Sequence, residues 1–110
     1  MNNKKKPFVK TLPTDQSEYF EILGKSNAVS MHSGLVTLEP GKDVGKHSTE
    51  NHEELIVVLD GEGEIEADGA IRTKIKKGQI AYNPPQTEHN LFNTGAKPLR
   101  YIYIVARAIE

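Results

Sequence analysis

The sequence predicts an all-β domain, a jelly-roll barrel built from many short strands. Runs of β-type residues recur along the 110-residue chain between clusters of Gly, Pro, Asn and Asp. These clusters follow one another roughly every eight to twelve residues, a spacing typical of sandwiches and small barrels. Only Asp15–Leu23 also carries helix signals, with Ser17 as its N-cap. We therefore expect an all-β fold with at most one short N-terminal helix.

The expected strands are each bounded by residues that favour turns. In chain order they are Tyr19–Leu23, Ser33–Leu38, Leu55–Leu59, Gly63–Ala67, Ile71–Lys76, Ile80–Asn83, His89–Phe92 and Leu99–Ala106. The first ends before a Gly-Lys-Ser-Asn cluster. The second ends at Pro40-Gly41, because proline removes a hydrogen-bond donor and glycine permits a tight turn.

The later strands differ in how they alternate. Leu55–Leu59 is continuously apolar, which predicts burial on both faces. The next two runs alternate charged with apolar or small residues around Asp68-Gly69, a hairpin signal. Pro84-Pro85 and Asn93-Thr-Gly95 then bound a short strand, and the last run is an apolar closing strand. With no repeat or linker, one domain over residues 1–110 is expected, with 1–7 as a flexible tail.

Composition argues against several classes of partner. The chain has 14 Lys and Arg against 15 Asp and Glu, and the two signs are intermixed, so no basic nucleic-acid footprint is predicted. Without cysteine there is neither a disulfide framework nor a thiol nucleophile. No apolar run reaches membrane-spanning length, and the N-terminus lacks the apolar stretch of a signal peptide. We expect a soluble cytoplasmic protein with no nucleic-acid or membrane partner.

Histidines beside carboxylates form the main functional signal. His47, His52 and Glu54 fall in one window and His89 falls in a second, about forty residues later. Imidazoles and a carboxylate converging from separate strands suit a borderline divalent metal. Residues two apart share a strand face, so His52 points with Glu54 if the chain is already extended there, while Glu53 points away.

The two windows resemble the two motifs of the cupin family. The first family motif is G-x5-H-x-H-x(3,4)-E-x6-G and the second is G-x5-P-x-G-x2-H-x3-N. The residues that match them are Gly41, His47, Glu54 and Gly61 in the first, and Gly78, Pro84, His89 and Asn93 in the second. Thr49 replaces the second histidine of the first motif, and Gln86 replaces the glycine of the second. Together the motifs run from Gly41 to Asn93, roughly half of the chain.

This resemblance implies a double-stranded β-helix that forms a homodimer and holds one divalent metal ion per chain. His52 would supply the imidazole that Thr49 lacks, so the expected ligands are His47, His52, Glu54 and His89, suited to Zn, Fe, Ni or Mn. If the turn near Glu50-Asn51 extends to His52, the set reduces to the other three residues. His32 matches neither motif, and we expect no ligand role for it. Candidate pocket walls are Thr49, Tyr82, Gln86, Tyr101 and Tyr103.

Three functions remain open, and no catalytic residue is assigned. The first is a metal-dependent enzyme that binds a small polar or carboxylate ligand and acts as a dioxygenase, decarboxylase or isomerase. The second is a non-catalytic, sensor-type binding module, with or without metal. The third is a structural dimer with a vestigial site, which the exchanges at Thr49 and Gln86 favour.

Overall fold

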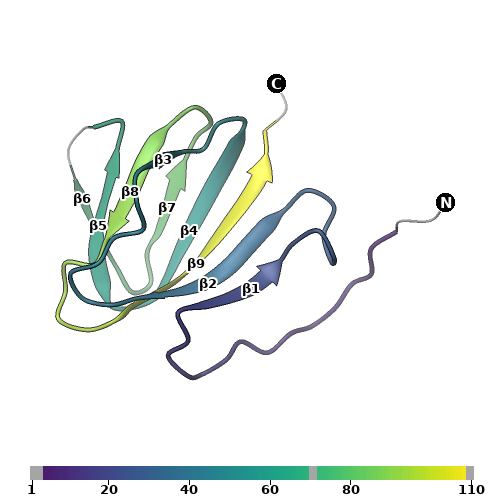
Figure 1. The fold of residues 1–110 in the computed structure, drawn as a ribbon, viewed down its shortest axis with the longest axis horizontal. Coiled ribbons are helices and arrows are strands. Elements are labelled where there is room, and N and C mark those ends of the chain that lie inside the picture. Colours follow the sequence, from purple (N-terminus) through teal and green to yellow (C-terminus); the bar gives the residue numbers. More distant parts are fainter. Residues whose placement is uncertain (1–3, 70–71, 109–110) are drawn as a thin grey trace.

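The structure is a computed structural model that describes residues 4–69 and 72–108. Within these residues the chain forms strands and turns and no helix, arranged as two antiparallel sheets (Figure 1). The five-stranded sheet has the order β1 (Tyr19–Leu23), β2 (His32–Leu38), β9 (Leu99–Arg107), β4 (His52–Asp60) and β7 (Ile80–Asn83). The four-stranded sheet has the order β3 (His47–Ser48), β8 (Glu88–Phe92), β5 (Glu62–Ala67) and β6 (Thr73–Lys76). Strands adjacent in space are mostly distant in sequence, as in a jelly roll.

The predicted all-β jelly roll is confirmed, and the N-terminal helix is not. Asp15 accepts hydrogen bonds from both the backbone N–H and the hydroxyl of Ser17, so the side chain that caps this turn is Asp15. The chain then enters β1 directly, because pairing with β2 satisfies the backbone groups that a helix would have used. The structure adds β3 to the predicted strands and starts β4 at His52. The predicted start of β6 at Ile71 lies outside the described residues.

The core lies between the two sheets. Its buried members come from both layers: Ile56, Val58, Ile75, Leu91, Leu99 and Tyr101. Strand β4 shows the alternation, with Glu54, Ile56 and Val58 buried on the inner face. Leu55 and Val57 on the outer face are only partly covered, so the expected burial of this strand on both faces is met on the inner face alone.

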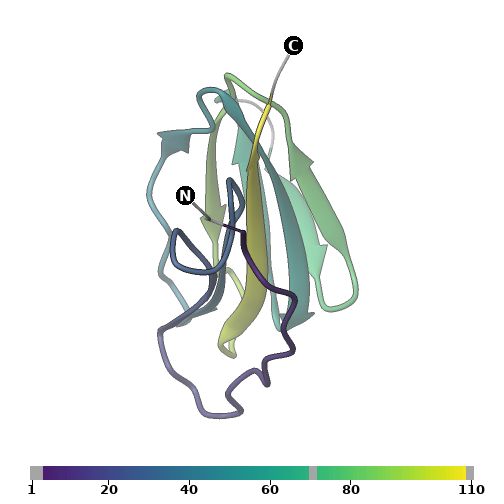
Figure 2. The ribbon, with the colours of Figure 1, turned by 90° about the vertical axis from the view of Figure 1, so that its right-hand side faces the viewer.

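The two sheets differ in width. In Figure 1, β3, β8, β5 and β6 gather at one side of the ribbon, whereas β1 and β2 lie at the other side, with the N-terminal segment beyond β1. Figure 2 shows the same arrangement turned by 90°. Strands β1 and β2 therefore form the edge of the five-stranded sheet that lies farther from the four-stranded sheet.

Asn93, the last residue of the second motif, closes the connection between β8 and β9. Its Nδ2 donates to the carbonyls of Leu38, at 2.8 Å, and Lys97, at 2.9 Å. Its Oδ1 accepts from the N–H of Gly95 at 2.8 Å. The side chain is buried, and its role is to satisfy loop backbone groups that would otherwise be left unpaired.

A substitution at Leu99 tests the placement of the core, because this side chain is completely buried at the start of β9. Leu99→Ala removes buried methyl groups and leaves a cavity, so we expect a loss of about 2–5 kcal/mol in the free energy of unfolding, measured by urea denaturation. The control is Leu59→Ala, at a partly exposed position on β4. Equal losses in the two variants would contradict the placement of the core.

Candidate functional site

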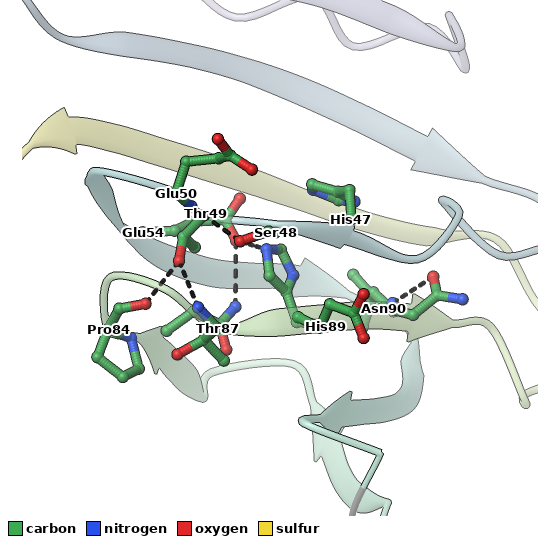
Figure 3. Close-up of polar contacts among 12 residues, drawn as sticks. His47, Ser48, Thr49, Glu50, Glu54, Pro84, Thr87, His89 and Asn90 are labelled. Atoms are coloured by element: carbon green, nitrogen blue, oxygen red, sulfur yellow. Dashed lines mark hydrogen bonds and ion pairs between the residues drawn. The ribbon is translucent and has the colours of Figure 1, made fainter.

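Three of the predicted site residues meet at one end of the space between the sheets (Figure 3). His47 on β3 pairs with His89 on β8, and their ring centroids lie 4.3 Å apart with an interplanar angle of 60°. Glu54 enters from β4 in the opposite sheet, with its Oε1 at 3.5 Å from His89 Nε2. Both sheets thus contribute to this cluster, which we call the donor end.

Burial determines the protonation of Glu54 and His89, which are 8% and 5% exposed. Loss of hydration raises the pKa of Glu54 above its ordinary value, although the Nδ2 of Asn83, which donates to Oε1 at 3.1 Å, and nearby His47 oppose the change. Burial, aided by His47, lowers the pKa of His89 to about 4. Each shift favours the uncharged form. At 3.5 Å, Glu54 and His89 are therefore a desolvated neighbouring pair rather than a strong ion pair.

His47 is exposed, and its ring orientation is set by its own loop. Nδ1 lies 2.8 Å from the carbonyl oxygen of Gly45. A carbonyl only accepts hydrogen bonds, so Nδ1 carries the proton and the lone pair of the neutral ring is on Nε2. His47 can thus offer Nε2 to a ligand or metal while Nδ1 stays bonded to the backbone.

A pocket of about 370 Å³ extends from the donor end between the sheets. Apart from the three donor residues, its lining is apolar or aromatic: Val36, Val44, Ile56, Leu91, Tyr101, Tyr103 and Val105. The volume is in the range of small-molecule sites, and the three His and Glu side chains of the lining sit together at one end. This arrangement can bind a small ligand whose polar group faces Glu54 and His89.

His52 lies beside this cluster in an adjoining hollow of about 360 Å³, which it lines together with Thr49 and the donor residues. The turn at Glu50-Asn51 ends before His52, so His52 begins β4 on the same strand face as Glu54, as parity predicted. Nevertheless, no group of three or more His, Cys, Asp or Glu side chains in residues 4–69 and 72–108 has an arrangement that could hold a metal ion.

Thr49 links two loops instead of presenting a free hydroxyl. Its Oγ1 donates to the Pro84 carbonyl at 2.7 Å and accepts from the Thr87 N–H at 3.0 Å (Figure 3). Gln86 also supports this junction, because its N–H donates to the carbonyl of Glu50 at 2.8 Å. Gln86 has φ of 56°, in the left-handed region where the family motif has glycine. The junction holds the β3–β4 turn against the β7–β8 turn, next to the donor end.

The tyrosines predicted as pocket walls are found in two places. Tyr101 and Tyr103 line the pocket from β9, and burial raises the pKa of both hydroxyls. Tyr82 is 56% exposed, and its hydroxyl donates to Glu53, which points away from Glu54 on β4. Gln86 is likewise absent from the described lining of the pocket and the adjoining hollow.

Sequence reasoning missed Asn83, the buried side chain that donates to Glu54. Asn83 lies opposite Glu54 in the β4–β7 ladder, and both residues face inward. The alternation of Ile80–Asn83 carried a signal, but using it requires the register between two strands, in which Glu54 and Asn83 are 29 residues apart in sequence.

Comparison with known proteins agrees with the sequence motifs. The family model described as "Cupin domain" matches residues 34–105, about two thirds of the chain. No curated protein matches significantly. No helix in the described residues is both long enough and apolar enough to cross a membrane.

Many solved structures share the fold. The Cnp3 cupin domain of Schizosaccharomyces pombe has a TM-score of 0.73 at 17% identity, covering 81% of this chain and 63% of its own. A predicted oxalate decarboxylase from Thermotoga maritima has a TM-score of 0.72 at 24% identity, with coverages of 81% and 78%. The DMSP lyase DddQ from Ruegeria pomeroyi has a TM-score of 0.70 at 19% identity, with coverages of 84% and 47%. These identities indicate a common fold alone.

The junction at Thr49 can be tested with a substitution that keeps the shape of the side chain. Thr49→Val removes the hydroxyl and leaves the Thr87 N–H and Pro84 carbonyl without their partner. We expect a loss of about 1–3 kcal/mol in the free energy of unfolding. Thr49→Ser keeps the hydroxyl and should retain most of the stability. Equal stability of Thr49→Val and wild type would refute this role.

The lowered pKa of His89 predicts an acid-sensitive fold. Between pH of about 4 and 6.5 the unfolded chain binds a proton at this ring that the folded chain does not, so stability falls as the pH falls through this range. Glu54 acts in the opposite sense: its raised pKa lets the folded state keep a proton above the unfolded value of 4.5, and stability is lost as pH rises.

We therefore expect His89→Gln to flatten, and Glu54→Gln to steepen, the rise in unfolding free energy with pH over this range. Urea denaturation of metal-free protein at several pH values measures both slopes. His32→Gln, at an exposed histidine, is the control. Slopes that shift in the same direction in the two test variants would contradict the assigned shifts.

Proposed function

We propose that this chain, which belongs to the cupin family, binds one divalent metal ion at the donor end and uses it to hold a small polar or carboxylate ligand in the pocket. The observation that carries the proposal is the convergence of His47, Glu54 and His89 from both sheets on one end of that pocket. The metal would be Zn, Fe, Ni or Mn, because imidazole and carboxylate donors suit all four.

The separation of Glu54 and His89 fits two ligands of one ion. Zinc binds nitrogen and oxygen at about 2.0–2.2 Å, so two adjacent ligand atoms lie roughly 3.0–3.5 Å apart. The observed separation is 3.5 Å. The lowered pKa of His89 also keeps its ring neutral at pH 7, as a metal ligand requires.

The remaining ligands need a small rearrangement. His47 is exposed and would offer the lone pair on Nε2 while Nδ1 keeps its hydrogen bond to Gly45 and β3 stays in register with β8. His52 shares the adjoining hollow with the other three residues and would be the fourth ligand. A buried carboxyl group and a neutral imidazole gain stability from a cation, which favours the ionised form of Glu54.

A bound ion would supply Lewis acidity toward the polar group of the ligand, the chemistry shared by decarboxylases, isomerases and dioxygenases. The chain itself would position the ligand between β2, β4, β8 and β9 and exclude water with its apolar walls. One structural relative carries the name of a predicted oxalate decarboxylase, in keeping with a carboxylate ligand.

The second candidate function is a metal-free, non-catalytic binding barrel. Two observations favour it: Thr49 replaces a family histidine and its hydroxyl is engaged by Pro84 and Thr87, and the described residues contain no ready-made metal group. In either case we expect a homodimer, for which the exposed Ile80 and Tyr82 on edge strand β7 offer an apolar surface.

Elemental analysis of untagged protein, purified without chelator or nickel resin, tests the metal. We expect close to one transition metal per chain in wild type, and loss of the metal in His47→Ala, His89→Ala and Glu54→Gln. Matched controls are His32→Ala and Glu53→Gln, which should retain it. His52→Ala distinguishes a four-ligand site from a three-ligand site by the size of the loss.

Absence of metal even after incubation with zinc, iron, manganese and nickel would refute the proposal and favour the metal-free barrel. Full metal content in His89→Ala would refute the assigned donor end even if metal is present elsewhere. Circular dichroism of each variant checks that the barrel is folded.

A further inference from the structure

The pocket is chemically divided along its length. The histidine and glutamate side chains of its lining lie at the donor end, while Val36, Ile56 and Leu91 form apolar walls between the sheets. Its volume of about 370 Å³ exceeds what a two-carbon acid would fill. A ligand bound only through an oxygen group at Glu54 and His89 would leave these walls in contact with water. The walls therefore favour a ligand with an apolar body behind its polar head.

Tyr103 places an aromatic ring against this apolar part. In the strand register Tyr103 lies opposite Ile56 on one side and Gly34 on the other, one inward position along from the pair formed by Glu54 and Val105. Its ring stacks on Tyr19 of β1, with centroids 6.4 Å apart and an interplanar angle of 22°. The two hydroxyl oxygens lie 2.6 Å apart, so each satisfies the other.

Gly34 makes this stack possible. A Cβ at this position would lie 2.6 Å from Cε1 of Tyr19, closer than any real contact, so the ring of Tyr19 occupies the space that a side chain would need. Tyr19 lies outside the matched family region, which begins at Gly34. Together, Tyr19 and Tyr103 form a supported aromatic wall on the five-stranded sheet. Tyr19 acts through Tyr103 and is a positioning residue.

We propose that the pocket selects ligands with an anionic oxygen head and an apolar aryl or branched-alkyl body, and that Val36 and the Tyr19–Tyr103 wall determine this preference. The inference rests on the proposed function, since the head binds at the donor end. Burying a benzyl-sized group strengthens binding by about tenfold or more. Small diacids, which lack such a body, are poorer ligands of this pocket.

Two hydroxamates with the same metal-binding head test the preference on zinc-loaded protein. Acetohydroxamate carries a methyl group, and phenylacetohydroxamate carries a benzyl group. Zinc binding is measured first, by isothermal titration, followed by each hydroxamate. We expect phenylacetohydroxamate to bind at least about tenfold more tightly.

Variants of the wall residues test whether the wall causes the preference for phenylacetohydroxamate. Val36→Thr places a hydroxyl on the apolar wall, and Tyr19→Ala removes the support of Tyr103. Each should weaken phenylacetohydroxamate severalfold and leave acetohydroxamate and zinc affinity unchanged. Tyr19→Phe keeps the ring and should retain most of the preference. The matched control Val29→Thr lies at an 87% exposed position and should change nothing.

The outcomes separate the two proposals. Zinc binding with equal affinity for the two hydroxamates overturns the inference and leaves the proposed function standing. Failure of zinc to bind overturns the proposed function and the inference with it. A wild-type preference that Val36→Thr and Tyr19→Ala both retain in full, in folded protein, overturns the assignment to this wall. The wild-type comparison needs no variant and is decisive even if Tyr19→Ala does not fold.

Discussion

The pairing of His47 opposite His89 limits how far apart the two imidazoles can lie, because directly opposed residues on antiparallel strands project to the same side at close range. The four-stranded sheet fixes that pair, and the ladders of β4 with β7 and β9 fix Glu54 on the facing sheet. A slip of one residue in β3 would turn His47 to the other face. The hydrogen bonds of Thr49 to Pro84 and Thr87 hold the adjoining turns together, and so support this register at the Thr49 end of β3.

Burial at the donor end has an electrostatic cost that a cation would relieve. Glu54 and His89 are both pushed toward their neutral forms, and they approach one another without forming a strong ion pair. A positive charge between them would let the carboxyl group ionise and the imidazole remain neutral. The charged forms of Glu54 and His89 are therefore both destabilised here, a condition typical of functional positions rather than of a core selected for stability.

The sequence predicted the fold and most of the cluster because both are encoded in local patterns. Glycine and proline turns delimited the strands, and alternation placed His52 with Glu54. The sequence alone could not reveal the two-residue strand β3, because so short a segment carries no periodicity. Nor could it predict the roles of Thr49 and Asn83, which depend on loops and strands brought together only by the tertiary fold. The helix signal at Asp15–Leu23 failed because pairing of β1 with β2 outweighed local propensity.

The donor residues and the residues of the aromatic and apolar wall lie on different strands of the barrel. The donor residues lie on β3, β4 and β8, whereas Val36, Tyr19 and Tyr103 lie on β1, β2 and β9. Substitutions in the second group can change the shape and polarity of the wall while leaving the hydrogen bonds around Glu54 and His89 intact. Such a division would let single exchanges on β1, β2 and β9 alter the ligand preference that we propose, while the donor residues stay unchanged.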